Sequence, residues 1–104
     1  MYSVVYAIYP KEGMSAEDFR RYLTEVHSEI GRRLPLVRRY EQFPVREIEG
    51  GEGPEIGAFA ILQFDSEQEF ETAAASDAMR EAGDDAPNFA RHFAAYLVDH
   101  NPLQ

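Results

Sequence analysis

The stretch Gly13–Tyr40, GMSAEDFRRYLTEVHSEIGRRLPLVRRY, decides the fold because it contains a helix start, a long amphipathic run and a helix stop. Ser15 is a preferred N-cap, and Asp18 follows three residues later, where a capping box places an acidic side chain. Pro35 predicts the end of the helix, because its ring and its missing N–H cannot continue the hydrogen-bond ladder. Between these signals, apolar residues at helical spacing predict one buried stripe, made of Phe19, Leu23, Val26, Ile30 and Leu34.

Two side chains with chemical potential flank this stripe, Tyr22 and His27. At about 100° per residue, His27 lies about 60° from the centre of the stripe, at its edge. The opposite face is polar and is expected to meet solvent; it contains Arg20, Arg21, Thr24, Glu25, Ser28 and Arg32.

The rest of the chain predicts four strands and a second helix. The strands are expected over Ser3–Tyr9, Leu36–Val45, Ile56–Phe64 and Arg91–Asp99. Pro44 favours an edge position or a bulge for the second strand, since a central strand needs every backbone donor. The glycines of Glu49–Glu55 predict a long hairpin loop. The second helix is expected to begin at Ser66 with a capping box to Glu69, to be capped again at Ser76, and to end at Gly83 before an irregular segment, Asp84–Phe89.

The order strand, helix, strand, strand, helix, strand is typical of the α+β class. It predicts a ferredoxin-like βαββαβ fold, a four-stranded antiparallel sheet with two helices on one face, in a single domain over residues 1–104. Three of the strands are apolar on both faces, yet two helices cover only one face. We therefore expect a homodimer whose sheets pack face to face as a dimeric α+β barrel.

Composition narrows the classes of partner. The chain of 104 residues has a net charge of −9, which argues against nucleic acid and against an anionic membrane surface. It contains no cysteine, which excludes disulfides and thiolate chemistry. The N-terminus lacks the basic region of a signal peptide, and no run approaches the roughly 20 apolar residues of a membrane helix. We expect a cytoplasmic protein.

Several segments resemble the EthD family of the dimeric α+β barrel superfamily. They are the first strand with its Tyr9–Pro10 turn, the motif GMS-x-E-x-F-R-R-Y, His27, the motif RLP-x-x-RRY, Phe64–Asp65–Ser66, and Asp85-x-x-x-Phe89. The resemblance implies the ferredoxin-like fold and a dimer. The wider superfamily contains cofactor-free monooxygenases, polyketide cyclases, isomerases and haem-binding enzymes, so the resemblance implies small-molecule chemistry without naming a reaction.

His27 and Asp85 are the candidate catalytic residues. An imidazole at the rim of an apolar pocket can act as a general base, whereas the alternative is a half-buried histidine bonded to a neighbouring strand. Asp85 can orient that imidazole. Its sequence context favours another role, an N-cap for the Ala86–Phe89 turn, because aspartate is a preferred cap and Pro87 suits a first turn.

Candidate substrate-binding residues combine an aromatic ring or apolar setting with a polar group. Phenols can hydrogen-bond a ligand while their rings form apolar wall, and a buried amide must find a partner in a ligand or a second subunit. The candidates are Tyr6, Tyr22, Tyr40, Gln63 and Tyr96. Each tyrosine has the alternative of being an ordinary core or interface aromatic.

His92 is a possible third member of a metal set with His27 and Asp85, but no close-spaced ligand pair such as H-x-x-x-H occurs, so no metal site is expected. The arginines at 32, 33, 38 and 39 are interpreted as helix-end and strand charges rather than an anion site. We therefore predict a cofactor-independent oxidoreductase, cyclase or isomerase acting on a small apolar or aromatic molecule. The alternatives are a non-catalytic binding or accessory protein of a catabolic or biosynthetic pathway, and a haem-binding relative with His27 as axial ligand.

Overall fold

The sheet is built around the first strand, β1 (Tyr2–Pro10). A computed structural model describes residues 1–46 and 55–103. The remaining strands are β2 (Arg39–Pro44), β3 (Ala58–Phe64) and β4 (Ala90–Val98), and all neighbours pair antiparallel in the order β2-β3-β1-β4. This confirms the ferredoxin-like α+β fold, and β2, which contains Pro44, is an edge strand as predicted. Of the predicted loop Glu49–Glu55, only Glu55 lies within the described residues.

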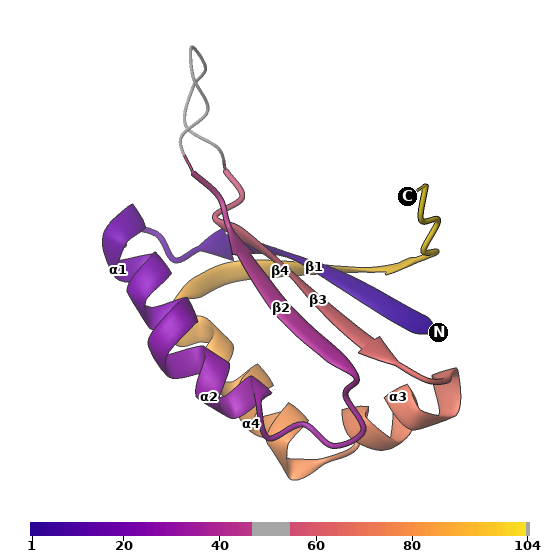
Figure 1. Cartoon of the computed structure of the whole chain (residues 1–104). Coiled ribbons are helices and arrows are strands. Elements are labelled where there is room, and N and C mark those ends of the chain that lie inside the picture. The colour runs from indigo at the N-terminus through magenta and orange to yellow at the C-terminus, as the bar shows by residue number, and fades with distance from the viewer. Residues whose placement is uncertain (47–54, 104) are drawn as a thin grey trace.

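The helices lie on one side of this sheet (Figure 1). The first is continuous but has three parts, α1 (Ala16–Arg21), the π-helical segment η1 (Tyr22–His27) and α2 (Ser28–Gly31). The second region comprises α3 (Glu67–Ala74), α4 (Asp77–Asp85) and the 3₁₀ turn η2 (Ala86–Asn88). Hydroxyl caps are confirmed at Ser15, Ser66 and Ser76, each of which accepts a backbone N–H three residues on. None of the helices within the described residues is long and apolar enough to cross a membrane.

Two predicted helix ends are wrong. The first helix ends at Gly31 instead of Pro35. The N–H groups of Arg33 and Leu34 then bond carbonyls three residues back, in a tighter turn that precedes Pro35. The following turn places Leu36 at φ 65°, so β2 begins at Arg39 and not at Leu36. Gly83 does not end the second helix either, since α4 continues through it to Asp85.

The two faces of the sheet differ in cover. The helix-facing side buries Val4 and Ile8 of β1 and Ala58, Leu62 and Phe64 of β3. No described element covers the opposite side, here called the outer face. Several large side chains of the outer face are exposed, namely Phe43, Phe59, Tyr96 and Val98. As predicted, the helices cover only one face of the sheet and leave apolar side chains on the other face exposed.

Candidate functional site

The π-helical segment η1 changes which residues of the first helix face the sheet. A π turn accommodates more residues than an α turn, and one extra residue rotates everything after it by about 100°. Val26, predicted to lie in the apolar stripe, is 45% exposed, whereas Ser28, predicted to face solvent, is buried. His27 moves from the predicted edge to the inward face, and its side chain is only 12% exposed.

Asp85, the last residue of α4, joins the two helices at this point. His27 Nδ1 lies 2.8 Å from Asp85 Oδ2, and the Tyr22 hydroxyl donates to Asp85 Oδ1 at 2.5 Å. Asn88 Nδ2 also donates to Oδ1, at 3.0 Å. The Asp85 side chain makes no capping bond to the following turn, so its interpretation as an N-cap is wrong.

The hydrogen bonds around Asp85 determine its charge. Burial raises the pKa of the Asp85 carboxyl, but the bonds from Tyr22, His27 and Asn88 outweigh this and hold the pKa below its ordinary value of 3.8. An ionised carboxylate only accepts hydrogen bonds, so Nδ1 of His27 carries the hydrogen in this pair. In a neutral imidazole the other nitrogen, Nε2, is then an acceptor, and it makes no hydrogen bond to any described residue.

Phe89 packs against the rings of His27 and Tyr22, the two side chains that bond to Asp85. Its fully buried ring lies 4.6 Å from the His27 ring and 5.3 Å from the Tyr22 ring, centroid to centroid. Phe19 and Phe93 complete its surroundings at 5.9 Å. Neither Phe89 nor Asn88 was predicted as a site residue. The sequence feature that could have identified them is their position three and four residues after Asp85. The 3₁₀ turn η2 brings residues at this spacing back toward the Asp85 carboxylate.

A cavity of about 360 Å³ lies between the sheet and the helices, with His27 in its wall. On the sheet side it is bounded by residues of all four strands, including Ile8, Leu62 and Phe93. Met79, Ala82, Gly83 and Ala86 form its wall on the side of α4 and η2. Among the described residues that line it there is no lysine, arginine, aspartate or glutamate. The cavity therefore suits a neutral, mostly apolar molecule at the small end of the usual range for ligand pockets.

Two predicted tyrosines supply phenols to this cavity, Tyr6 and Tyr40. Burial raises the pKa of both hydroxyls, so both stay protonated near neutral pH. The Tyr40 hydroxyl accepts a hydrogen bond from Gln42 Nε2 at 2.8 Å, and the same nitrogen donates to the Leu23 carbonyl at 3.0 Å. The hydrogen of the Tyr40 hydroxyl remains to be donated to a ligand. Gln42 was not predicted as a site residue. Its position two residues after Tyr40, on the same face of the strand, could have identified it.

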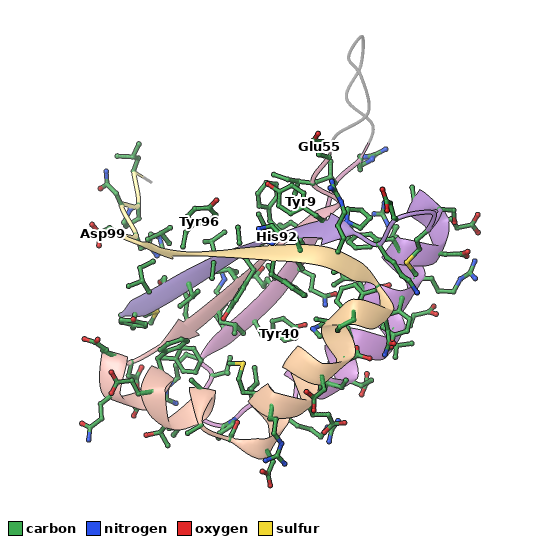
Figure 2. All side chains as sticks on the ribbon, turned by 180° about the vertical axis from the view of Figure 1, so that it is seen from behind. Tyr9, Tyr40, Glu55, His92, Tyr96 and Asp99 are labelled. Atoms are coloured by element: carbon green, nitrogen blue, oxygen red, sulfur yellow. The ribbon has the colours of Figure 1, made fainter. Side chains whose placement is uncertain are left out.

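Three predicted substrate-binding residues do not line the cavity. Tyr22 bonds to Asp85 and so belongs to the support of His27. Gln63 is on the outer face, where its buried amide donates to the Ser3 hydroxyl at 3.1 Å. Tyr96 is also on the outer face and is 56% exposed. Figure 2 shows Tyr96 on the side of the sheet away from the helices and Tyr40 pointing toward them.

His92 is also outside the site, because it pairs with Tyr9 across the outer face at 5.3 Å between ring centroids. Within residues 1–46 and 55–103, no group of three or more potential ligands could hold a metal ion. Each arginine of the predicted cluster has a carboxylate partner: Arg32 pairs with Glu29, Arg33 with Glu81, Arg38 with Asp65, and Arg39 with Glu41. These pairs leave no concentrated positive charge for an anion.

The Tyr22–Asp85 hydrogen bond predicts a pH window of stability. Because the folded pKa of Asp85 is lowered, its contribution is present above 3.8 and is lost as the pH falls through the folded value. The bond to Asp85 raises the pKa of Tyr22, so its contribution is present below 10.0 and is lost as the pH rises through the folded value. We expect Tyr22→Phe to lower the free energy of unfolding at pH 7 by about 1–2 kcal/mol.

This difference between the wild type and Tyr22→Phe should shrink at both ends of a series of urea unfolding curves from pH 3 to pH 11. In the variant, Asp85 has one donor fewer and its folded pKa is lowered less, so the variant should lose less stability than the wild type as the pH falls. Tyr9→Phe, which removes a phenol on the outer face, is the matched control and should show no such window. A Tyr22→Phe difference that is constant from pH 3 to pH 11 would contradict the assignment.

The sequence and the fold were compared with known protein families and solved structures. The family model for the EthD domain matches residues 11–92. A search of the curated proteins finds no match. Among solved structures, an EthD family protein from Bacillus halodurans matches with a TM-score of 0.80 and 18% identity, covering 97% of this chain and 100% of that one.

Two further solved structures share the fold. A dimeric protein of unknown function with a ferredoxin-like fold, from Bacteroides fragilis, matches with a TM-score of 0.70 and 12% identity over 95% of both chains. An antibiotic biosynthesis monooxygenase matches with a TM-score of 0.67 and 16% identity, over 98% of this chain and 100% of that one. The fold agrees throughout, and the family model covers most of the sequence, including His27, Asp85 and Phe89. This chain therefore belongs to the EthD family.

Proposed function

We propose that this protein is a cofactor-independent enzyme that removes a proton from a small, neutral, mostly apolar molecule, with His27 as general base. The observation that carries the proposal is the pairing of an apolar cavity with an imidazole whose Nδ1 is held by a carboxylate. A histidine needed only for packing would not require the three hydrogen bonds that fix Asp85. Asp85 is the positioning residue, and it stabilises the imidazolium that forms.

The chemical step follows from these positions. A C–H bond next to a carbonyl group of the substrate breaks, its proton moves to His27 Nε2, and the electron pair moves onto the carbonyl oxygen as an enolate. The Tyr40 hydroxyl, oriented by Gln42, donates a hydrogen bond to that oxygen. The enolate can then be reprotonated at another atom, attack a second carbonyl of the same molecule, or react with dioxygen. These outcomes correspond to isomerisation, cyclisation and oxidation, and all three begin with the same proton transfer.

This shared first step can be measured without knowing the natural substrate. We expect the protein to accelerate hydrogen–deuterium exchange at the carbons next to the carbonyl of 4-phenylbutan-2-one in D₂O, followed by ¹H NMR. This ketone is neutral and apolar, as the cavity requires. Binding of the ketone without exchange above the buffer rate would instead support the alternative, a non-catalytic protein that binds or carries such molecules.

The outer face supports a second part of the proposal, a homodimer with sheet packed against sheet. Its exposed apolar side chains, Phe43, Phe59, Tyr96 and Val98, form a surface that a monomer would leave in water. A structurally similar protein from Thermobifida fusca is described as dimeric, as is the one from Bacteroides fragilis. A second copy of this chain brings the same apolar face and is therefore a complementary occupant.

We expect the wild type to have about twice the chain mass of 11.9 kDa in solution at micromolar concentration, measured by light scattering after gel filtration. Phe59→Glu places a charge on the outer face and should give a monomer, because the carboxylate would be buried in the dimer. Thr72→Glu, on the exposed side of α3, is the control and should leave the mass unchanged. A monomeric wild type would contradict the dimer.

A further inference from the structure

Gly83 lies inside helix α4, where a glycine normally costs stability. The usual structural reasons for a glycine are missing here. Its φ is not positive, and a Cβ built on it would meet no atom within 4 Å. Gly31, which also lines the cavity, is the opposite case, because a Cβ there would lie 2.6 Å from the Tyr40 ring. Packing therefore explains Gly31 and does not explain Gly83.

Gly83 lies in the wall of the cavity. The cavity-lining residues Met79, Ala82, Gly83 and Ala86 have the spacing i, i+3, i+4, i+7, which is one stripe of a helix. The other three members of the stripe are partly buried, whereas Gly83 is exposed. The stripe thus combines a wall made by Met79 and two alanines with one point, Gly83, that both lines the cavity and meets solvent.

We propose that Gly83 is the mouth of the cavity and sets how long an apolar tail its ligand can have. The inference rests on the proposed function and extends it to a ligand class, a neutral molecule with an oxygen group toward His27 and Tyr40 and an apolar tail that passes Gly83. The cavity runs between two clusters of the core, one containing Leu23 and the other containing Leu62, and Tyr6 and Tyr40 pack against both. Because the cavity is apolar and touches both clusters, it fits an apolar tail better than a compact polar ligand.

A series of 4-alkylphenols, from 4-methylphenol to 4-heptylphenol, tests the inference by titration calorimetry. In the wild type each buried methylene should tighten binding by about fourfold until the tail reaches solvent. Gly83→Leu should reduce the ratio of heptyl to methyl affinity by at least about tenfold, since the leucine side chain would occupy the mouth. Asp84→Leu adds the same bulk at the next, exposed position, which does not line the cavity, and should keep the wild-type ratio.

Gly83→Ala supplies a second readout. Removing a glycine from a helix without a steric conflict should raise the melting temperature by a few degrees, while the heptyl-to-methyl ratio falls partway. A heptyl-to-methyl ratio that Gly83→Leu leaves unchanged would overturn the inference, as would a lower melting temperature for Gly83→Ala. If the wild type binds none of the phenols, the proposed function fails along with it. Binding with an unaltered ratio removes only the role of Gly83.

Discussion

Replacing His27 by alanine should lower the exchange rate of 4-phenylbutan-2-one by about 10²–10⁴-fold, the usual contribution of a general base. The reason is that His27 is the only residue with a basic side-chain nitrogen among the described residues that line the cavity. The phenols of Tyr6 and Tyr40 cannot replace it, because burial raises their pKa values and keeps them protonated. ¹H NMR in D₂O at neutral pH measures the rate.

The fold should survive this substitution, so the loss can be assigned to chemistry. Asp85 would keep its bonds from Tyr22 and Asn88 and would not become an unpartnered buried charge. Circular dichroism and the melting temperature check this point. His92→Ala removes the exposed histidine of the outer face and should leave the rate unchanged. If His27→Ala exchanges the ketone as fast as the wild type, His27 is not the base.

Periodicity in the sequence predicted the elements and their order because each strand and helix buries one side against a neighbour. The serine caps were predictable for a local reason, since each cap bonds a backbone group three residues away. The position of His27 was not predictable in this way. The segment YLTEVH contains no glycine or proline to mark an interruption, so a regular helix placed Val26 inward and His27 at the edge.

The π-helical segment is explained by contacts on either side of it. In a regular α-helix, Gly31 would lie about 80° around the helix from Leu23. The wider turn returns Gly31 to the buried face, where it meets the Tyr40 ring. That constraint joins residues from two different elements, so no local pattern reveals it. Tyr96 was misplaced for a similar reason: the register Val5↔Tyr96 decides which face it occupies, and the register is set by pairing with β1.

Asp85→Asn should lower the same exchange rate by at least about tenfold, by analogy with the effect of losing the carboxylate that orients a metal-binding histidine. The substitution keeps the size of the side chain but removes its charge. An amide can either accept or donate toward the imidazole, so Nδ1 of His27 would no longer be held as the donor. The developing imidazolium would also lose the carboxylate that stabilises it, and the enolate would form more slowly.

Nitrogen chemical shifts of the His27 ring separate this positioning role from a general loss of stability. In the wild type the neutral ring should carry its hydrogen on Nδ1, because the ionised Asp85 only accepts. In Asp85→Asn the shifts of the two ring nitrogens should move toward each other as both tautomers become populated. Asp84→Asn, at the neighbouring exposed aspartate, should change neither the shifts nor the rate. An Asp85→Asn variant that keeps the Nδ1–H tautomer and the wild-type rate would show that the carboxylate only joins the two helices.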